Sequence, residues 1–174
     1  RLQSDQLGVM VSRQSFPTAI KAGPVIADDK VFVAGTDGIV RALDTALTET
    51  RGQFETGGEI LGTPAWSGEL LVFGSGDGHV YAVDDGGKLE WKHNAGQPVY
   101  GWPLIADGTV YIGDNGGRMH ALDLKTGKPR WTFERADYAI ESQPCLWGDH
   151  LVFGAWDGYV YAVRAATGDL TWKA

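Results

Sequence analysis

The four histidines, His79, His93, His120 and His150, are the first side chains whose spacing can be tested against a known chemistry. A helical zinc site needs ligands at fixed short intervals, such as His-x-x-x-His, and no pair here has that spacing. The four also fall at different places in their local segments. We therefore predict no metal ligands among them and interpret them as hydrogen-bonding groups at the surface or between packed sheets.

Acidic turns are a second candidate. Asp77-Gly78 and residues 114–117 (DNGG) place carboxylate and amide oxygens in tight loops, and calcium prefers such oxygen ligands. Asp and Asn also stabilise turns by accepting hydrogen bonds from nearby backbone amides. Because similar turns recur along the chain, we favour the turn-stabilising role and keep calcium as the alternative.

Nucleophilic and phosphate-binding motifs are absent from the sequence. There is no Gly-x-Ser-x-Gly elbow to support a Ser-His-Asp triad. The glycine-rich residues 74–78 join two strand-like runs and do not lead into a helix, which argues against a phosphate cradle. Cys145 is the only cysteine, so no intrachain disulfide can form, and we expect it to be a small buried residue. We predict no catalytic residues.

The composition excludes further classes. The net charge is -7 and no cluster of Lys and Arg occurs, so a nucleic-acid partner is not expected. No run of 18 apolar residues is present, so we predict no membrane span. Residues 1–10 lack the apolar core of a signal peptide and the chain lacks an initiator Met, so we expect a processed or trimmed product. The 25 glycines and 7 tryptophans indicate many tight turns and a few large anchoring rings.

An internal repeat explains most of the chain. Pro24, Pro64, Pro103 and Pro144 are 40, 39 and 41 residues apart, and an apolar run that follows each of them keeps the same intervals. Each run leads through a Gly-containing turn, usually Asp-Gly, to a second run with a central alanine, and these alanines are Ala42, Ala82, Ala121 and Ala162. Apolar runs joined by Asp-Gly predict β-hairpins.

A period near 40 residues with three or four short strands per unit predicts an all-β fold, a β-propeller of four four-stranded antiparallel blades. The blades correspond to residues 19–58, 59–97, 98–138 and 139–174. Each blade is covered on both faces by its neighbours, which explains why strands such as LVFG are almost continuously apolar. The inner strand follows the proline, and the outer strand carries Trp91, Trp131 or Trp172. We expect these tryptophans, with the turn glycines Gly78, Gly127 and Gly158, to be structural.

The repeat pattern DGxVYAxDxxTGxxxW, present here in residues 77–83, 157–163 and 121–131, resembles the quinoprotein-type repeat of PQQ-like β-propellers. That family includes PQQ-dependent alcohol dehydrogenases and non-enzymatic propellers of the outer-membrane assembly lipoprotein kind. The resemblance implies a periplasmic or extracellular location, and for an enzyme it implies PQQ with calcium. The dehydrogenases carry an adjacent cysteine pair near the cofactor, which a chain with one cysteine cannot supply.

Two departures bear on architecture. The first unit lacks the closing tryptophan, and we expect Phe54 to replace it after a small shift. The family usually has seven or eight blades, whereas this chain supplies four. Residues 1–18 contain one more strand candidate, Leu7–Val11, which we interpret as an extra outer strand. We therefore favour half of an eight-bladed ring, completed by a second copy or by residues outside this chain, over a closed four-bladed propeller.

Positions that differ between the repeats are the candidates for function. A residue required by the fold recurs in every unit, so variable positions just before the prolines are free to bind a ligand. They are expected at the mouth of the axial channel, where a mixed aromatic and polar patch can hold a ligand or a partner peptide. The predicted binding residues are Lys21, Thr63, Tyr100, Trp102, Tyr138, Glu141 and Gln143. Ordinary loop packing is the alternative.

Three functions remain open. The leading prediction is a non-catalytic scaffold or protein-interaction module without a cofactor. The second is a ligand-binding or PQQ-binding unit of a quinone-dependent oxidoreductase, with the cofactor stacked on Trp102. The third is a structural subunit of a repeating assembly that grows through open sheet edges.

Overall fold

The structure is a computed structural model that describes residues 15–27 and 29–174. Strand and turn residues account for its regular structure, and no described residue belongs to a helix that could cross a membrane. The expected extra strand Leu7–Val11 lies outside the described residues.

Four antiparallel sheets, here called blades 1 to 4, follow one another along the chain. Blades 1 and 2 comprise β1 (Val25–Ala27), β2 (Lys30–Ala34), β3 (Ile39–Asp44), β4 (Thr50–Glu55), β5 (Ala65–Trp66), β6 (Leu71–Gly74), β7 (His79–Val83) and β8 (Leu89–Asn94). Blades 3 and 4 comprise β9 (Leu104–Ala106), β10 (Thr109–Gly113), β11 (Met119–Asp123), β12 (Pro129–Phe133), β13 (Cys145–Trp147), β14 (His150–Gly154), β15 (Val160–Arg164) and β16 (Leu170–Lys173).

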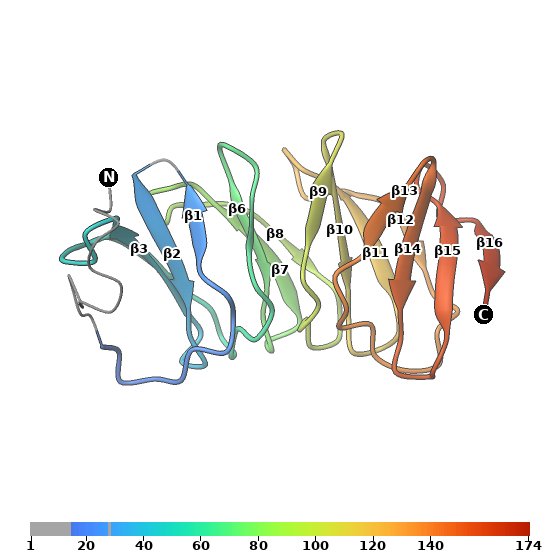
Figure 1. Cartoon of the computed structure of the whole chain (residues 1–174), viewed down its shortest axis with the longest axis horizontal. Helices are drawn as coiled ribbons and strands as arrows, with labels where there is room; N and C mark the ends of the chain where they lie inside the picture. The colour runs from blue at the N-terminus through green and yellow to red at the C-terminus, as the bar shows by residue number, and fades with distance from the viewer. Residues whose placement is uncertain (1–14, 28) are drawn as a thin grey trace, which may run out of the picture.

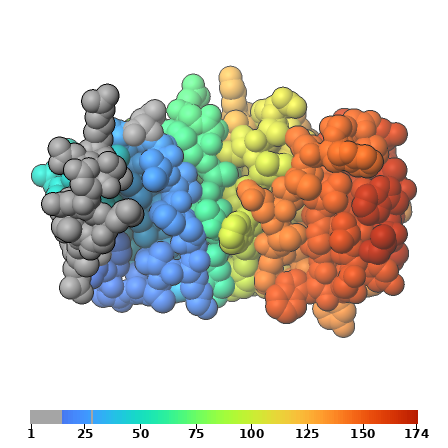
Figure 2. Space-filling view, in the orientation of Figure 1, coloured from blue at the N-terminus to red at the C-terminus, as the bar shows by residue number. Residues whose placement is uncertain are grey.

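The blades stand side by side in an open row. Blades 1 and 4 lie at opposite ends, and the innermost strands β1, β5 and β9 contact one another in order (Figure 1). The space-filling view shows the same succession as one continuous body (Figure 2). The alternative of a closed four-bladed ring is therefore wrong for this structure, whereas an arc of propeller blades is confirmed.

Apolar clusters fill each space between successive blades. Leu71–Gly74 of β6 is buried along its whole length, because blade 1 covers one face of the strand and blade 3 covers the other. An aromatic cluster of Phe54, Phe73 and Tyr81 joins blades 1 and 2, and Phe133, Phe153 and Tyr161 form its counterpart between blades 3 and 4. Burial on both faces accounts for the continuous apolar runs.

The closing tryptophans lie opposite the small residues, as their spacing predicts. Trp91 pairs across the sheet with Ala82, and Trp131 pairs with Ala121. The Trp91 Nε1 donates a hydrogen bond of 2.8 Å to the carbonyl of Leu124 in the next blade. Gly127, at a φ of 66°, packs so closely on the Trp91 ring that an added Cβ would lie 2.5 Å from it. Trp131 repeats the arrangement with blade 4, donating to the carbonyl of Ala165 at 2.9 Å.

Blade 1 has no tryptophan at this position, and its contact with blade 2 is built from glycine instead. Gly52 lies opposite Ala42 at the tryptophan position, and Phe54 pairs with Val40 farther along the strand. The expectation that Phe54 replaces the tryptophan is therefore wrong. Gly52 instead meets the backbone of Gly86, so closely that an added Cβ would lie 2.3 Å from the Gly86 carbonyl oxygen. Two glycine backbones in contact leave no gap for a large ring.

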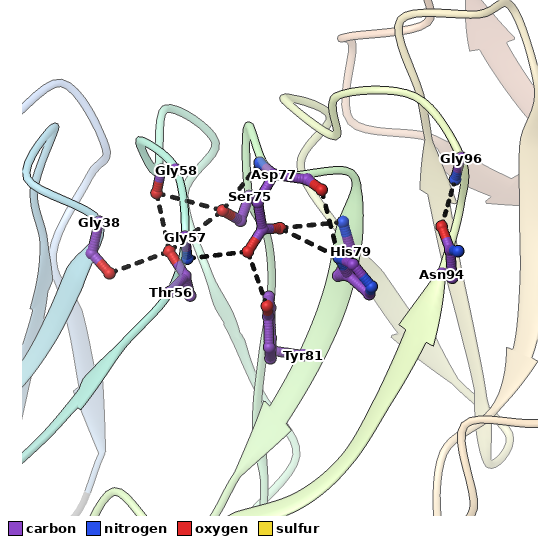
Figure 3. A network of polar contacts seen from close by, with 10 residues as sticks. All are labelled: Gly38, Thr56, Gly57, Gly58, Ser75, Asp77, His79, Tyr81, Asn94 and Gly96. Carbon is purple, nitrogen blue, oxygen red and sulfur yellow. Dashed lines mark hydrogen bonds and ion pairs between the residues drawn. The ribbon is translucent and has the colours of Figure 1, made fainter.

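In blades 2 and 4, an aspartate side chain connects the blade to the segment that precedes it. Asp77 accepts a hydrogen bond of 2.7 Å from the Tyr81 hydroxyl and one of 2.9 Å from the amide of Gly57, which follows the outer strand of blade 1 (Figure 3). It also accepts from the amide of His79 in its own turn. Asp157 repeats this in blade 4, with Tyr161 and the amide of Asp137. The preferred turn-stabilising role of these aspartates is confirmed, and it extends to holding successive blades together.

The same strand position carries a different partner in the other two blades. In blade 1, Arg41 pairs with Asp37 at 2.6 Å. In blade 3, His120 contacts Asp114 at 2.9 Å, and both side chains are buried. In each of the four blades, a carboxylate in the turn between the second and third strands therefore contacts a side chain at this position of the third strand, and Asp114 also accepts a hydrogen bond from Arg118 Nε at 2.9 Å.

We expect Asp77→Asn to destabilise the protein, with a pH dependence that identifies the carboxylate. Burial opposes ionisation of Asp77, but the hydrogen bonds from Tyr81 and the Gly57 amide outweigh it and lower its pKa. The stabilisation is thus complete above the unfolded-state pKa of about 4 and is lost as the pH falls through the lower folded-state pKa. At pH 6 the variant should lose about 1–3 kcal/mol of unfolding free energy in urea titrations.

The difference between Asp77→Asn and the wild type should shrink as the pH falls from 6 to 3. Glu69→Gln, which alters an exposed carboxylate in the same blade, is the control and should leave the curve in place. A destabilisation that is constant over this pH range would contradict the role of the charge.

Candidate functional site

A cavity of about 480 Å³ lies where three linkers between blades meet. Leu61, Tyr100, Trp102, Glu141, Ser142 and Gln143 line it. They come from three linkers, each of which runs from the outer strand of one blade to the inner strand of the next. We name each linker by the two blades that it connects: 1–2, 2–3 and 3–4. We call the cavity itself the channel-mouth cavity.

Each of these linkers contains a three-residue segment, here called its display segment, and the residues on both sides of that segment are buried. A fully buried apolar residue precedes the segment: Ile60, Val99 or Ile140. A buried proline follows it: Pro64, Pro103 or Pro144. The display segments are residues 61–63, 100–102 and 141–143. Their side chains are presented by backbone whose flanks are held in the core.

The linkers are also tied to the turns of both adjoining blades. The amide of Val99 donates to the carbonyl of Ser75 in blade 2, and the carbonyl of Pro98 accepts from the amide of Asn115 in blade 3. At Gly101 the backbone passes so close to blade 3 that an added Cβ would lie 2.6 Å from the Gly113 carbonyl oxygen. Glycine is required there by close approach, so Tyr100 and Trp102 project from a rigid support.

Tyr100 connects two linkers. Its hydroxyl donates a hydrogen bond of 2.5 Å to Glu59 of linker 1–2, and its ring covers Gly76. The hydrogen bond to Glu59, together with burial and the negative charges of Glu59 and Glu141, raises the pKa of Tyr100 to about 12. Tyr100 is therefore a neutral hydroxyl at physiological pH, in a negative local field.

Trp102 and the segment from linker 3–4 complete the wall. Trp102 is 42% exposed. Gln143 donates from Nε2 to the carbonyl of Pro103 at 3.4 Å, which ties linker 3–4 to linker 2–3. Ser142 is fixed to blade 4, because its hydroxyl donates to the Gly154 carbonyl and accepts from the Gly154 amide. The result is an open, partly aromatic cavity with one carboxylate, Glu141, on its wall.

The structure brings together four of the seven predicted binding residues: Tyr100, Trp102, Glu141 and Gln143. The other three do not line the cavity. Thr63 uses its hydroxyl to accept the amide of Gly23, Lys21 is exposed on the segment before blade 1, and Tyr138 is 65% exposed outside the cavity.

Leu61, Ser142 and Glu59 are not among the predicted binding residues. The repeat register places Leu61 at the channel mouth with Tyr100 and Glu141, and Ser142 lies between two predicted residues of its display segment. Glu59 lies before the buried Ile60, and its contact with Tyr100 is visible only in three dimensions.

Other chemistry-bearing residues have structural partners or lie apart. Cys145 is exposed on β13, so the expectation that it is buried is wrong. It begins the inner strand of blade 4, the last of the described blades. His93 and His120 meet ring to ring at 5.5 Å between blades 2 and 3, and burial together with the charge of His120 lowers the pKa of His93. The described residues include no group of three or more His, Cys, Asp and Glu that could hold a metal ion.

Comparison with known proteins identifies relatives of two kinds. The family model described as outer membrane protein assembly factor BamB matches residues 37–174. BamB of Burkholderia pseudomallei is 24% identical over 155 residues, covering 86% of this chain and 41% of the relative. The quinohemoprotein alcohol dehydrogenase of Comamonas testosteroni is 31% identical over 96 residues, covering 48% of this chain and 14% of the enzyme. The chain thus spans about two fifths of the length of the BamB relative.

Solved structures agree on the fold. BamB from Moraxella catarrhalis superimposes with a TM-score of 0.69 at 21% identity, over 90% of this chain and 65% of that one. The computationally designed Ika4 protein superimposes with a TM-score of 0.78 at 18% identity, over 91% of this chain and 99% of that one. At these identities the likeness establishes the arrangement of blades alone.

We expect Trp102→Ala to leave the stability almost unchanged, within about 0.5 kcal/mol, because the side chain is a wall of an open cavity rather than part of the core. Tyr100→Phe should cost about 1 kcal/mol, because it removes the hydroxyl that joins Tyr100 to Glu59. Both are measured by urea denaturation at pH 7. A loss above about 2 kcal/mol for Trp102→Ala would place that ring in the core instead.

Proposed function

The chain belongs to the family of the outer membrane protein assembly factor BamB, and from that premise we propose that it is a non-catalytic scaffold that binds a segment of another protein. The observation that carries this proposal is the channel-mouth cavity. It is built from the three display segments, the positions that differ between otherwise similar repeats. A rigid, open, partly aromatic surface is typical of the sites where proteins bind peptides and other proteins.

The proposal extends to location and partner class. A factor that assembles outer membrane proteins acts where those proteins are assembled, so we place this chain in the periplasm or outside the cell. Its partner there is a protein, because the net charge of -7 opposes binding to nucleic acid.

A PQQ-binding role fits the cavity poorly. PQQ carries three carboxylates, so a pocket for it needs positive charge or many hydrogen-bond donors. Glu141 lies on the wall of the channel-mouth cavity and Glu59 lies beside Tyr100. Among the described residues that form the wall there is no Lys, Arg or His. Trp102 offers an aromatic face, but the charge around it has the wrong sign. We infer that the chain acts without this cofactor.

A second candidate interaction surface is the face of blade 4 that is turned away from blade 3. Trp172 lies opposite Ala162 as the other closing tryptophans do, yet it is 39% exposed, since none of the described blades packs on this face of blade 4. Leu146, Tyr159 and Val160 of the same blade are also exposed. Trp91 and Trp131 show what covers such a ring, namely the turn between the third and fourth strands of the next blade.

Blade 1 has a turn of the right length to receive Trp172. In blades 3 and 4, which each receive a tryptophan, this turn covers residues 123–128 and 164–169. Residues 44–49 of blade 1 are equally long, whereas residues 84–88 of blade 2, which face Gly52, are one residue shorter. Thr48 stands where Gly127 and Gly168 meet the tryptophan rings, so the blade 1 turn would have to pack on Trp172 with a local arrangement of its own. We propose that a second copy covers blade 4 with its blade 1 and completes an eight-bladed ring.

Photo-crosslinking tests the scaffold proposal. A benzophenone amino acid replaces Leu61, which lines the cavity, or Trp156, which is 72% exposed and lies outside it. In envelope preparations, position 61 should give one discrete protein adduct that position 156 does not give. Equal adducts from both positions, or none from position 61, would contradict binding at the cavity.

Native mass spectrometry of this chain tests the ring. We expect a dimer, and Trp172→Ala should shift the population towards the monomer, because it removes the ring that blade 1 would cover. Tyr138→Ala is the control and should leave the dimer intact, because Tyr138 is 65% exposed in the linker between blades 3 and 4, away from the proposed interface. A stable, monodisperse monomer of the wild-type chain would contradict the proposal of a ring made of two copies.

A further inference from the structure

The channel-mouth cavity is negatively charged, and the scaffold proposal alone does not say which kind of partner such a charge would favour. Glu141 is part of its wall, and Glu59 lies at the Tyr100 hydroxyl. Within the described part of the chain, no hydrogen bond or ion pair engages the Glu141 carboxylate. An ionised group on the wall of a cavity favours a ligand of opposite charge.

The raised pKa of Tyr100 is consistent with a negative field in the cavity. Besides its hydrogen bond to Glu59 and its partial burial, the charges of Glu59 and Glu141 raise the pKa of Tyr100. Both carboxylates therefore act on the same point of the cavity. Because the Tyr100 proton is donated to Glu59, the hydroxyl oxygen remains available as an acceptor.

The remaining wall groups suit a planar cation. Trp102 presents an aromatic ring that is 42% exposed, and tryptophan is the strongest partner for cations over a ring face. Gln143 uses Nε2 on the Pro103 carbonyl, which leaves its amide oxygen as an acceptor. Acceptors and an aromatic ring dominate a cavity whose described wall contains no basic side chain.

We propose that the channel-mouth cavity binds the guanidinium of an arginine side chain, presented by an extended segment of the partner protein. Arginine fits better than lysine, because its flat group stacks on Trp102 while its N–H groups reach Glu141 and the neighbouring acceptors. The volume of about 480 Å³ accommodates one long side chain with part of its backbone. The inference rests on the scaffold proposal and gives that partner its chemistry.

Titration with capped peptides tests this directly. The probes are acetylated and amidated Gly-Ser-X-Ser-Gly, where X is arginine, lysine or citrulline, which has the shape of arginine without its charge. Binding to the ¹⁵N-labelled full chain is followed by the tryptophan indole signals, with the Trp102 signal assigned from its loss in Trp102→Phe. We expect the arginine peptide to shift the Trp102 signal and to bind about tenfold more tightly than the citrulline peptide, with lysine between them.

Variants separate the parts of the cavity. Glu141→Gln keeps the size of the side chain and removes its charge, and it should weaken arginine binding about tenfold while reducing its salt dependence. Trp102→Ala should weaken binding by a similar factor, followed at the next most shifted signal. Trp156→Ala, outside the cavity, should bind as the wild type does. Equal binding of the arginine and citrulline peptides, or no shift at Trp102 with 10 mM peptide, would overturn the proposal.

The two proposals fail in different ways. If position 61 crosslinks a protein but the arginine peptide does not bind, the scaffold stands and the cationic specificity is wrong. If the arginine peptide binds but position 61 crosslinks nothing, the cavity recognises a cation and the scaffold proposal is wrong.

Discussion

Every blade of this protein has two apolar faces, and a single four-stranded sheet cannot cover both of them. The structure depends on that constraint, because within the described residues the neighbouring blades supply most of the cover. The contact of Trp91 with Gly127 shows how closely the cover fits: the ring takes the space of a Cβ and its indole donates to the neighbouring backbone. A buried indole N–H without a partner would be costly, so this hydrogen bond fixes both the spacing and the orientation of successive blades.

The same constraint explains what the sequence reveals about the fold. Alanine and tryptophan recur at a constant interval because they face each other across every outer strand pair in blades 2 to 4. The pattern failed at blade 1, where the nearest aromatic residue, Phe54, suggested a substitute. Gly52 occupies the position instead, and the shorter turn of blade 2 brings Gly86 against it. That pair of compensating changes lies in two different repeats, so no single repeat could reveal it.

The candidate site was predictable in its location but not in its composition. Comparing the repeats indicated the segments before the prolines, since residues that the fold requires recur and those that it does not require vary. Four predicted residues meet there, whereas Thr63 supports the linker by accepting from Gly23. Thr63 and Trp102 occupy the same register position before the proline, so the register alone could not show that one bonds to Gly23 while the other lines the cavity. The contact of Glu59 with Tyr100 joins two linkers and likewise leaves no signal in the sequence.

The anchoring of the linkers connects the architecture to binding. A loop that is mobile in the free protein must lose conformational entropy when it binds, and that loss subtracts from affinity. Here the buried residues Val99 and Pro103 hold the ends of the segment that carries Tyr100 and Trp102, and the contact at Gly101 holds its middle. The residues on either side of Gly101 are thus free to change in type while their backbone stays in place. A repeat fold of this kind can therefore acquire a specific site without weakening the contacts that stack its blades.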